Sequence, residues 1–373
     1  MSAPLSANIT PASVTISGLA VSNKVYDSTA TASLVGNPNI SGLLIGDTSL
    51  LIGDATTGTF ADINVGNSIA VTANLSNLSL SNNNYIINGV SAPLSANITP
   101  APITISGLSA NDKVYDRSAS ATLSGTAVIA SGVLGLDSVT ISGSATSGTF
   151  AGMNVSSSRI AVTPSFTGLT LSSDNYYIAN VSTALSANIT PASVTISGLS
   201  ANDKVYDRSA SATLSGTPVI ASGLFSGDTA TVSGSATAGT FADINVGNSI
   251  DVNPNLSGLT LSNSNYRIEG LAQPLRASIT QAPIRISGLL ADSKVYDGTT
   301  TVTLRGVPTI DGLLTCDSSS ISGSVNAVFS NANAGTAVAV STNLIELSIS
   351  NSNYYIAGIL NPLTANITPA PLT

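Results

Sequence analysis

Apolar and polar residues alternate in short runs along the whole chain. Val14 and Ile16 alternate with polar residues up to Gly18, and residues 94–98 alternate in the same way before Pro100. Runs of this period, bounded by Gly, Asn, Asp and Pro, are typical of half-buried β-strands. No window of ten or more residues carries the apolar stripe of a helix. The pattern therefore predicts an all-β fold, with about seven short strands in every ~90 residues.

The same residues recur about every 90 positions. The string KVYD occurs four times, and its tyrosines lie 89, 91 and 90 residues apart. The markers N-Y and I-T-[PQ]-A keep the same spacing later in each repeat. The recurrent motif residues are Lys24, Tyr26, Asp27, Lys113, Tyr115, Asp116, Lys204, Tyr206, Asp207, Lys294, Tyr296 and Asp297. Units of this length are too long for solenoid coils, so we expect each repeat to enclose its own core.

The markers divide the chain into tandem segments. The predicted segments are 1–10 (the tail of a preceding repeat), 11–99, 100–190, 191–280 and 281–368 (repeats 1 to 4), and 369–373 (the start of a following repeat). Because the I-T marker occurs five times, we expect a stretch of a longer array. Pro11, Pro100 and Pro191 should stiffen the junctions, and Gln281 takes their place in the fourth. We predict four immunoglobulin-like β-sandwich repeats in a rod, with β-grasp-like repeats as the alternative.

Composition excludes several functions. Only 8% of the residues are charged and the net charge is −8, so the clustered cations that bind nucleic acid or anionic membranes are absent. No apolar run is long enough for a transmembrane helix. Histidine is absent and Cys316 is the single cysteine. We therefore expect no enzyme, no catalytic residues, no cofactor and no metal.

The aromatic residues fall at fixed places in the repeat. All ten tyrosines lie in KVYD or in and just after N-Y, and Phe60, Phe150, Phe241 and Phe329 share one position. Such residues form either a ligand platform or the anchors of each core, and we expect core anchors. The loop after Phe60 carries oxygen groups of the kind that calcium accepts. Its second and fourth copies lose the carboxylates, so we interpret it as a loop.

The lysine and aspartate of KVYD predict a turn held by an ion pair, although a binding loop has the same residues. A covalent alternative follows from surface domains in which an early Lys bonds to a late Asn beside an acid. The candidate isopeptide pairs are Lys24–Asn84, Lys113–Asn175, Lys204–Asn265 and Lys294–Asn353. The intervening acids are Asp47, Asp137, Asp228 and Asp317, which we expect in solvated Gly-rich turns. We expect the lysine to stay non-covalent and to reach Asp or backbone carbonyls.

KVYD, the later N-Y and the closing I-T-P-A together resemble the YDG repeats of large secreted bacterial proteins, notably filamentous-haemagglutinin-type adhesins. Only Gly298 keeps the glycine of that name, because Ser28, Arg117 and Arg208 replace it in the other repeats. The turn type therefore stays open at the sequence level.

The resemblance implies structural stalk repeats of an extracellular, cell-surface-attached adhesin that project a distal binding domain. The implied partners are neighbouring repeats and a host or cell-surface ligand held by domains outside this chain, with no nucleic acid and no membrane insertion. Two alternatives remain: the repeats themselves bind glycan or protein, or they self-assemble into an extracellular filament or matrix.

Overall fold

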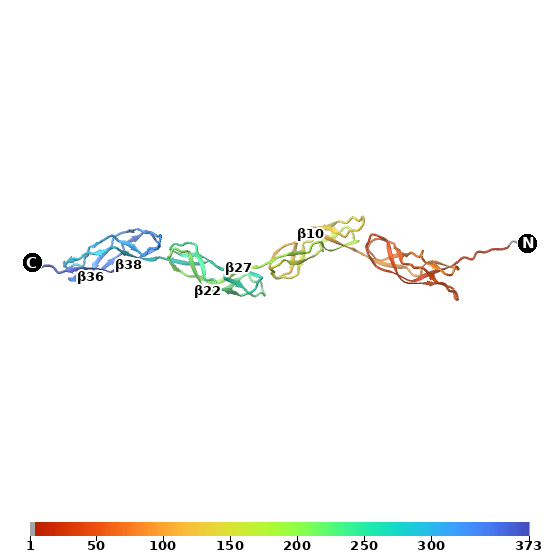
Figure 1. The fold of residues 1–373 in the computed structure, drawn as a ribbon, viewed down its shortest axis with the longest axis horizontal. Coiled ribbons are helices and arrows are strands. Elements are labelled where there is room, and N and C mark those ends of the chain that lie inside the picture. Colours follow the sequence, from red (N-terminus) through yellow and green to blue (C-terminus); the bar gives the residue numbers. More distant parts are fainter. Residues whose placement is uncertain (1–3, 373) are drawn as a thin grey trace. The chain divides into compact units, whose positions relative to one another are not determined.

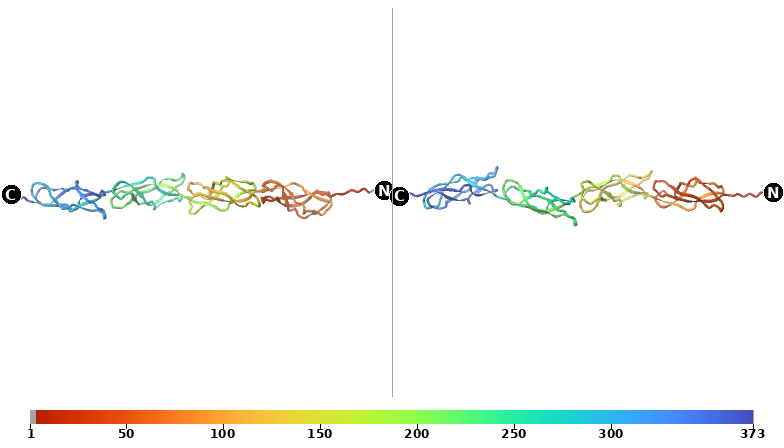
Figure 2. Two further views of the ribbon diagram at one scale, coloured as in Figure 1. Left: turned by 90° about the horizontal axis from the view of Figure 1, so that it is seen from above. Right: turned by 60° about the horizontal axis from the view of Figure 1, so that its bottom comes forward.

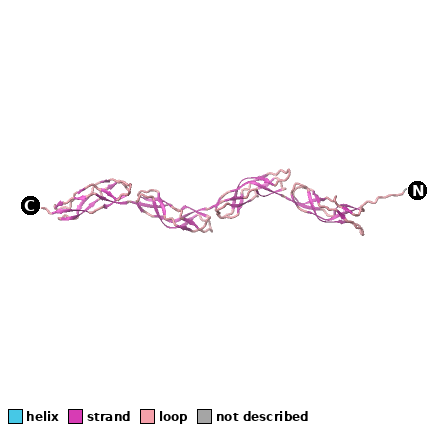
Figure 3. Cartoon of the chain, in the orientation of Figure 1, coloured by secondary structure: helices cyan, strands magenta, loops and turns pink. Residues whose placement is uncertain are grey.

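The structure is a computed structural model that describes residues 4–372. Strands and turns make up this part of the chain, and Figure 3 shows no helix in it. The predicted all-β fold of four tandem, sandwich-like repeats is confirmed. The β-grasp alternative does not fit, because that fold needs a helix. The chain divides into two compact units, Met1–Thr190 and Pro191–Thr373, and each contains two of the repeats that Figure 1 shows in sequence colours.

The first unit contains repeats 1 and 2. The strands of repeat 1 are β1 (Ala12–Val21), β2 (Lys24–Val25), β3 (Thr31–Ser41), β4 (Leu51–Ile52), β5 (Thr57–Phe60), β6 (Gly66–Ala73), β7 (Ser79–Leu80), β8 (Tyr85–Val90) and β9 (Leu94–Thr99). The strands of repeat 2 are β10 (Ala101–Ala110), β11 (Lys113–Val114), β12 (Ser120–Ser131), β13 (Ile141–Gly143), β14 (Ser147–Phe150), β15 (Ile160–Pro164), β16 (Leu169–Leu171), β17 (Tyr176–Val181), β18 (Leu185–Ala187) and β19 (Ile189–Thr190).

The second unit contains repeats 3 and 4. The strands of repeat 3 are β20 (Ala192–Ala201), β21 (Lys204–Val205), β22 (Ser211–Ser222), β23 (Val232–Gly234), β24 (Ala238–Phe241), β25 (Gly247–Pro254), β26 (Leu259–Leu261), β27 (Tyr266–Leu271) and β28 (Leu275–Thr280). The strands of repeat 4 are β29 (Ala282–Ser287), β30 (Leu290–Ala291), β31 (Lys294–Val295), β32 (Leu304–Arg305), β33 (Thr309–Asp311), β34 (Ile321–Ser322), β35 (Asn326–Phe329), β36 (Gly335–Asn343), β37 (Ser348–Ile349), β38 (Tyr354–Ile359) and β39 (Leu363–Thr368).

The main sheet of repeat 1 has the strand order β2-β9-β6-β5-β3-β1-β8, and repeat 3 repeats this order from β21 to β27. The start of β1 pairs in parallel with β8, whereas the end of β9 pairs in parallel with β2. Because the strands run along the length of each repeat (Figure 2), these two pairings mark its opposite ends. We call them the N-terminal end, where β1 begins, and the C-terminal end, where β9 finishes.

A pair of glycines lets the longest strands of repeat 1 continue through a bend. The register between β1 and β3 shifts beside Gly18. A Cβ atom on Gly18 would lie 2.3 Å from the Asn37 carbonyl oxygen, and one on Gly36 would lie 2.2 Å from the Gly18 carbonyl oxygen. Both residues have positive φ, so only glycine fits without a backbone shift. The bend joins the two ends of the repeat in one sheet.

The apolar cores run across the repeat boundaries inside each unit. In the first unit, one cluster joins Tyr26, Phe60 and Ile98 from the C-terminal end of repeat 1 to Ile103 and Tyr176 from the N-terminal end of repeat 2. The corresponding cluster of the second unit includes Tyr206, Phe241, Ile279, Ile284 and Tyr354. The prediction that each repeat encloses its own core is therefore wrong at these two boundaries, where consecutive repeats share one core.

Candidate functional site at the joints between repeats

The KVYD motif forms a turn that its lysine and aspartate hold together. Lys24 Nζ donates to Asp27 Oδ1 at 2.7 Å and to the Thr29 carbonyl at 2.6 Å. The same nitrogen lies 5.5 Å from the centroid of the Phe60 ring, within cation–π range. Asp27 Oδ1 also accepts the Thr29 N–H at 2.9 Å, the bond of an Asx turn. The Lys–Asp distance is 2.6 or 2.7 Å in all four repeats, so each lysine braces its turn.

The residue after the aspartate adopts the left-handed conformation in every repeat. Its φ is 57° at Ser28, 65° at Arg117, 64° at Arg208 and 73° at Gly298. The turn is therefore the same in all four copies, although only the last has the glycine that this conformation favours. The three non-glycine copies carry backbone strain, which the contacts of the lysine with the aspartate and the following backbone carbonyl have to offset.

The bracing also shows in the acidity of the aspartate. Hydrogen bonds from Lys294 and then from Thr299 lower the pKa of Asp297 to about 2. The carboxylate therefore stays charged through the physiological pH range and keeps its partners.

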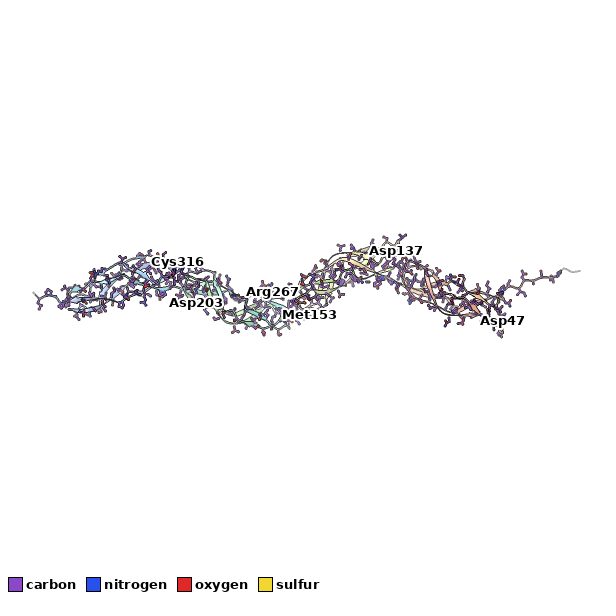
Figure 4. The ribbon with its side chains drawn as sticks, in the orientation of Figure 1. Asp47, Asp137, Met153, Asp203, Arg267 and Cys316 are labelled. Carbon is purple, nitrogen blue, oxygen red and sulfur yellow. The ribbon has the colours of Figure 1, made fainter. Side chains whose placement is uncertain are left out.

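The turn presents its tyrosine to the next repeat in the first unit. Tyr26 Oη donates to Asp137 Oδ2 at 2.8 Å, and Tyr176 Oη donates to the same oxygen at 2.6 Å. Tyr26 belongs to repeat 1, whereas Asp137 and Tyr176 belong to repeat 2. The two rings meet edge to face with centroids 5.4 Å apart. Figure 4 marks Asp137 at this joint and Asp47 at the opposite end of repeat 1.

The second unit repeats this cluster between repeats 3 and 4. Tyr206 and Tyr354 donate to Asp317 Oδ2 at 3.1 and 2.5 Å, and their ring centroids are 5.5 Å apart. Arg208 adds an ion pair, with Nε 2.8 Å from Asp317 Oδ1, and it also donates to the Thr315 carbonyl. The arginine that replaces the motif glycine therefore contacts the neighbouring repeat.

The shared carboxylate shifts the acidity of its partners. The hydrogen bond to Asp137, with burial of the ring, raises the pKa of Tyr26 to about 12. Hydrogen bonds from Tyr176 and Tyr26 hold the pKa of Asp137 below its ordinary value. Burial and the hydrogen bond to Asp317 raise the pKa of Tyr206 in the same way. The cluster of the first unit therefore favours protonated tyrosines around an ionised Asp137.

The asparagine of the N-Y motif forms the second part of the joint. Asn175 Oδ1 accepts the Val65 N–H at 2.8 Å, and Asn175 Nδ2 donates to Asn64 Oδ1 at 2.8 Å. Asn64 is held in turn by Asp62, whose Oδ1 accepts its N–H at 2.9 Å. The loop that begins at Phe60, which has calcium-like oxygen groups in the sequence, is thus the surface on which the next repeat sits.

The equivalent asparagine of the second unit is buried. Asn353 Oδ1 accepts the Val246 N–H at 2.8 Å, and Nδ2 donates to Asn245 Oδ1 at 2.9 Å. The side chain satisfies both of its polar atoms there, as a buried amide must. Asn353 is only 8% exposed.

The chain crosses each of these joints through a single residue. The Thr99 carbonyl accepts the Tyr26 N–H at 2.8 Å, and the Ala101 N–H donates to the Asn175 carbonyl at 2.9 Å. Pro100 between them has no N–H to leave unpaired. In the second unit Gln281 replaces the proline, and its Nε2 donates to the carbonyls of Ser352 and Tyr354 at 3.0 and 3.1 Å.

The structure does not bring the candidate isopeptide partners together in repeats 2 and 4. Lys113 Nζ lies 2.6 Å from Asp116 Oδ1 at the C-terminal end of repeat 2, whereas Asn175 contacts repeat 1 at the N-terminal end. In repeat 4, Lys294 contacts Asp297 and Thr299, and Asn353 contacts repeat 3. The lysine contacts are the non-covalent ones expected from the sequence.

Two expectations about side chains are wrong. Tyr177, Tyr296 and Tyr355 are about half exposed, so not every tyrosine is a core anchor. Asp137 and Asp317 are partly buried beneath two tyrosines each, and they do not lie in solvated turns. Tyr177 and Tyr355 each follow a buried tyrosine in a strand and therefore lie on its outer face. Asp137 and Asp317, in contrast, are each covered by a tyrosine of the preceding repeat as well as by one of their own.

Sequence reasoning missed the aspartate and the loop asparagine as parts of one site. Both recur in register with the tyrosines, at Asp137 and Asp317 and at Asn64 and Asn245. That shared register is the signal that was available. It gives no direction, however, because a residue that recurs in each repeat can face its own repeat or the next one.

Neither a cluster of metal-binding side chains nor a membrane-spanning helix occurs in the described part of the chain. No group of three or more His, Cys, Asp or Glu side chains that could hold a metal ion occurs among residues 4–372. Within the same residues, no helix has the length and apolar character needed to cross a bilayer.

Comparison with known proteins gives one family. The family model described as YDG domain matches residues 10–92, 99–184, 190–273 and 280–361. No curated protein matches the chain. Among solved structures, three immunoglobulin domains of titin are 10% identical, with a TM-score of 0.20, and the match covers 70% of this chain and 96% of that one. The four N-terminal immunoglobulin domains of Dscam1 are 11% identical, with a TM-score of 0.16, over 95% and 100% of the two chains.

Proposed function

Because the chain belongs to the YDG domain family, in four tandem copies, we propose that it is a structural spacer of an extracellular bacterial surface adhesin. The repeats hold a distal binding domain away from the cell, and the chain itself catalyses no reaction and needs no cofactor. Its partners in this role are the neighbouring repeats, and the receptor is bound by other domains of the parent protein.

The observation that supports this role is the buried joint. Consecutive repeats inside each unit share an apolar cluster, a Tyr–Asp–Tyr cluster and an asparagine that bonds to the neighbouring loop. A flexible linker would leave these groups in water. A joint that fixes one repeat on the next is what a spacer needs to keep its far end at a set distance.

Spin labels test whether the joint is fixed. Thr72→Cys in repeat 1 and Thr163→Cys in repeat 2 place labels on two exposed strand positions, in a chain that also carries Cys316→Ser. We expect one narrow distance distribution, because the joint restricts the two repeats. The control adds Asp137→Ala, which should broaden the distribution. A broad distribution in the chain with an intact joint would contradict the spacer role.

Localisation is tested on the source bacterium. Antibodies raised against this chain should label intact, unpermeabilised cells, and added protease should remove the label. Labelling that requires permeabilisation would contradict a surface location.

Ligand binding by the repeats is a second candidate function, favoured by one observation. Tyr177 is half exposed beside a cavity of about 300 Å³ whose lining includes Phe166 and Asp174. Aromatic rings with a nearby carboxylate suit a sugar. Binding of a glycan that is lost in Tyr177→Ala, on an array or by titration, would support this function over a passive spacer.

A further inference from the structure

We propose that Asn74 and Asn255 are glycosylation sites, at which a sugar is attached to the side-chain nitrogen. Residues 74–76 in repeat 1 and 255–257 in repeat 3 both read NLS, and Asn-X-Ser is the acceptor pattern of N-linked glycosylation. The donor is a sugar activated as a glycosyl diphosphate. The inference does not depend on the spacer role, which the spin labels and the cell labelling test separately.

Both asparagines lie in the same turn, directly after a strand of the main sheet. Asn74 follows β6, and Asn255 follows β25 at the equivalent position of repeat 3. The sheet holds each backbone N–H, because Asn74 donates to the Thr57 carbonyl and Asn255 to the Ala238 carbonyl, both at 2.9 Å. Both side chains are exposed. A transferase can therefore reach either amide in the folded chain.

The turn engages the amide oxygen and leaves the amide nitrogen free. Asn74 Oδ1 accepts the Ser76 N–H at 3.1 Å and the Ser76 hydroxyl at 2.7 Å. Asn255 Oδ1 accepts the same two groups of Ser257, again at 3.1 and 2.7 Å. Neither Nδ2 atom donates a hydrogen bond to another group among residues 4–372. The atom that has to form the new bond therefore has no competing partner in these residues.

These two hydrogen bonds favour reaction at the nitrogen. An amide nitrogen is a weak nucleophile because the carbonyl shares its lone pair, so the reaction requires the loss of an Nδ2 proton to a base of the transferase. The negative charge then lies largely on Oδ1, where the N–H and O–H of Ser76 stabilise it. Nδ2 forms a bond to C1 of the sugar, the bond from C1 to the diphosphate oxygen breaks, and the diphosphate leaves with the electron pair.

A cavity beside each turn has room for the attached sugar. In repeat 1 its volume is about 480 Å³, and its lining includes Leu75, Ser76 and Ile86. The cavity of repeat 3 has about 490 Å³ and is lined from the equivalent positions. Volumes of this size accommodate small ligands. Ile86 is 54% exposed, so the apolar face of a sugar ring has a surface on which to pack.

The other two repeats keep the turn, but each lacks one part of the acceptor pattern. In repeat 2, Ser165 replaces the asparagine, and its hydroxyl bonds to that of Thr167 at 3.1 Å. In repeat 4, Asn343 Oδ1 accepts the Ile345 N–H at 3.0 Å, and the isoleucine has no hydroxyl to add. The turn therefore forms without a serine hydroxyl, so folding alone does not explain the serine in repeats 1 and 3.

The same acceptor pattern also occurs inside strands, where its atoms have other partners. In β9, Asn97 Oδ1 accepts the Ser68 N–H at 2.8 Å, whereas the Thr99 hydroxyl donates to the Lys24 carbonyl at 3.3 Å. The corresponding residues of β39 make the equivalent bonds. The hydroxyl and the amide oxygen are bonded to different neighbours there, so we expect no sugar at Asn97.

Peptide mass mapping of the chain purified from its source bacterium tests the proposal. We expect the peptides that contain Asn74 and Asn255 to be heavier by a sugar residue or an oligosaccharide, and the peptide that contains Asn97 to be unmodified. Ser76→Ala should abolish the modification of Asn74 and leave that of Asn255, which is the control in the same chain. Ser76 is exposed, so the substitution changes the stability little.

A second variant tests whether the turn with its hydroxyl is sufficient. Ile345→Ser completes the acceptor pattern in the turn of repeat 4, and Asn343 should then gain a sugar. Ile345 is 85% exposed, so little packing is lost. Unmodified Asn74 and Asn255 in the native chain, modification of Asn97 to the same extent, or an Ile345→Ser variant that stays unmodified at Asn343 would overturn the proposal.

Two incubations distinguish the sources of the donor. Chain produced without modification is mixed either with a soluble extract of the source bacterium and nucleoside diphosphate sugars, or with the membrane fraction and its lipid-linked sugars. Transfer to Asn74 in the first mixture assigns a nucleotide-bound donor, and transfer in the second assigns a lipid-bound donor. Transfer to Asn97 as fast as to Asn74 in either mixture would contradict the role of the turn.

Discussion

Strain at a single residue of the KVYD turn differs between repeats that are otherwise alike. Gly298 has open space where a Cβ atom would lie, so a side chain there meets only the backbone penalty of a positive φ. We expect Gly298→Ala to lower the free energy of unfolding of repeat 4 by about 1 kcal/mol. Chemical denaturation of the full chain, followed by hydrogen exchange for each repeat, measures the change.

The reverse substitution provides the matched test. Ser28→Gly removes a non-glycine residue at φ 57° and should stabilise repeat 1 by up to about 1 kcal/mol. Equal shifts of the same sign for Ser28→Gly and Gly298→Ala would contradict a backbone origin.

The asparagine of the N-Y motif gives the second residue-scale prediction. Asn353→Ala removes the acceptor of the Val246 N–H and the donor to Asn245 inside a buried joint. We expect a loss of about 1–3 kcal/mol in the free energy of unfolding of the second unit, the range for an unpaired buried polar group. Denaturant unfolding measures it.

The first repeat supplies the control for this prediction. Asn84 occupies the same position of the repeat but is exposed. Asn84→Ala should change the stability by no more than about 0.5 kcal/mol. A loss at Asn84 as large as that at Asn353 would assign the asparagine a role within its own repeat.

At the scale of strands and turns, much of the structure follows from the sequence. The alternation at Val14 and Ile16 places both side chains in the core of β1, where they are buried. The lysine–aspartate turn also follows, since its partners lie within five residues of each other. The partner of Tyr26, in contrast, is Asp137, which lies 111 residues away in another repeat. Periodicity identifies recurring residues, but a contact across a joint also depends on how one repeat docks on the next.

The Tyr–Asp–Tyr cluster makes the joint sensitive to alkali. The pKa of Tyr26 is raised from 10.0 to about 12, so the native joint holds this proton more tightly than the unfolded chain does. A raised pKa contributes stability that is complete below pH 10 and is lost as the pH rises from 10 to 12. We therefore expect the free energy of unfolding of the first unit to fall across this window.

A single substitution tests whether Tyr26 causes the loss of stability in alkali. The Tyr26→Phe variant has no hydroxyl to titrate at that position, so its free energy of unfolding should fall less steeply between pH 10 and pH 12. Denaturant unfolding at each pH measures this slope. The aspartate of the same cluster makes the joint sensitive to acid instead of alkali. Hydrogen bonds from Tyr176 and Tyr26 lower the pKa of Asp137, so its contribution is present above its ordinary pKa and is lost as the pH falls through its lower, folded-state pKa. A stability that is level through the alkaline window would contradict the tyrosine–aspartate account.

At the scale of the whole molecule, the shared cores predict that a destabilising substitution in one repeat also destabilises the repeat on the other side of the joint. Ile98 lies in the cluster that also contains Ile103 and Tyr176 of repeat 2. We expect Ile98→Ala to lower the free energy of unfolding by about 2–5 kcal/mol, as core truncations do. Hydrogen exchange should show lost protection in β10 and β17 of repeat 2 as well as in repeat 1, because both pack on the cavity that the truncation leaves.

The last repeat gives the control for this coupling. Ile367 has the position of Ile98 and is 1% exposed too, but its cluster contains residues of repeat 4 alone. Ile367→Ala should be as destabilising, and its lost protection should stay within repeat 4. The comparison separates coupling through a joint from the general effect of a core cavity, because the two substitutions remove the same atoms from the same position of the repeat. If Ile98→Ala leaves β10 and β17 as protected as before, the repeats are independent beads and the joint only positions them.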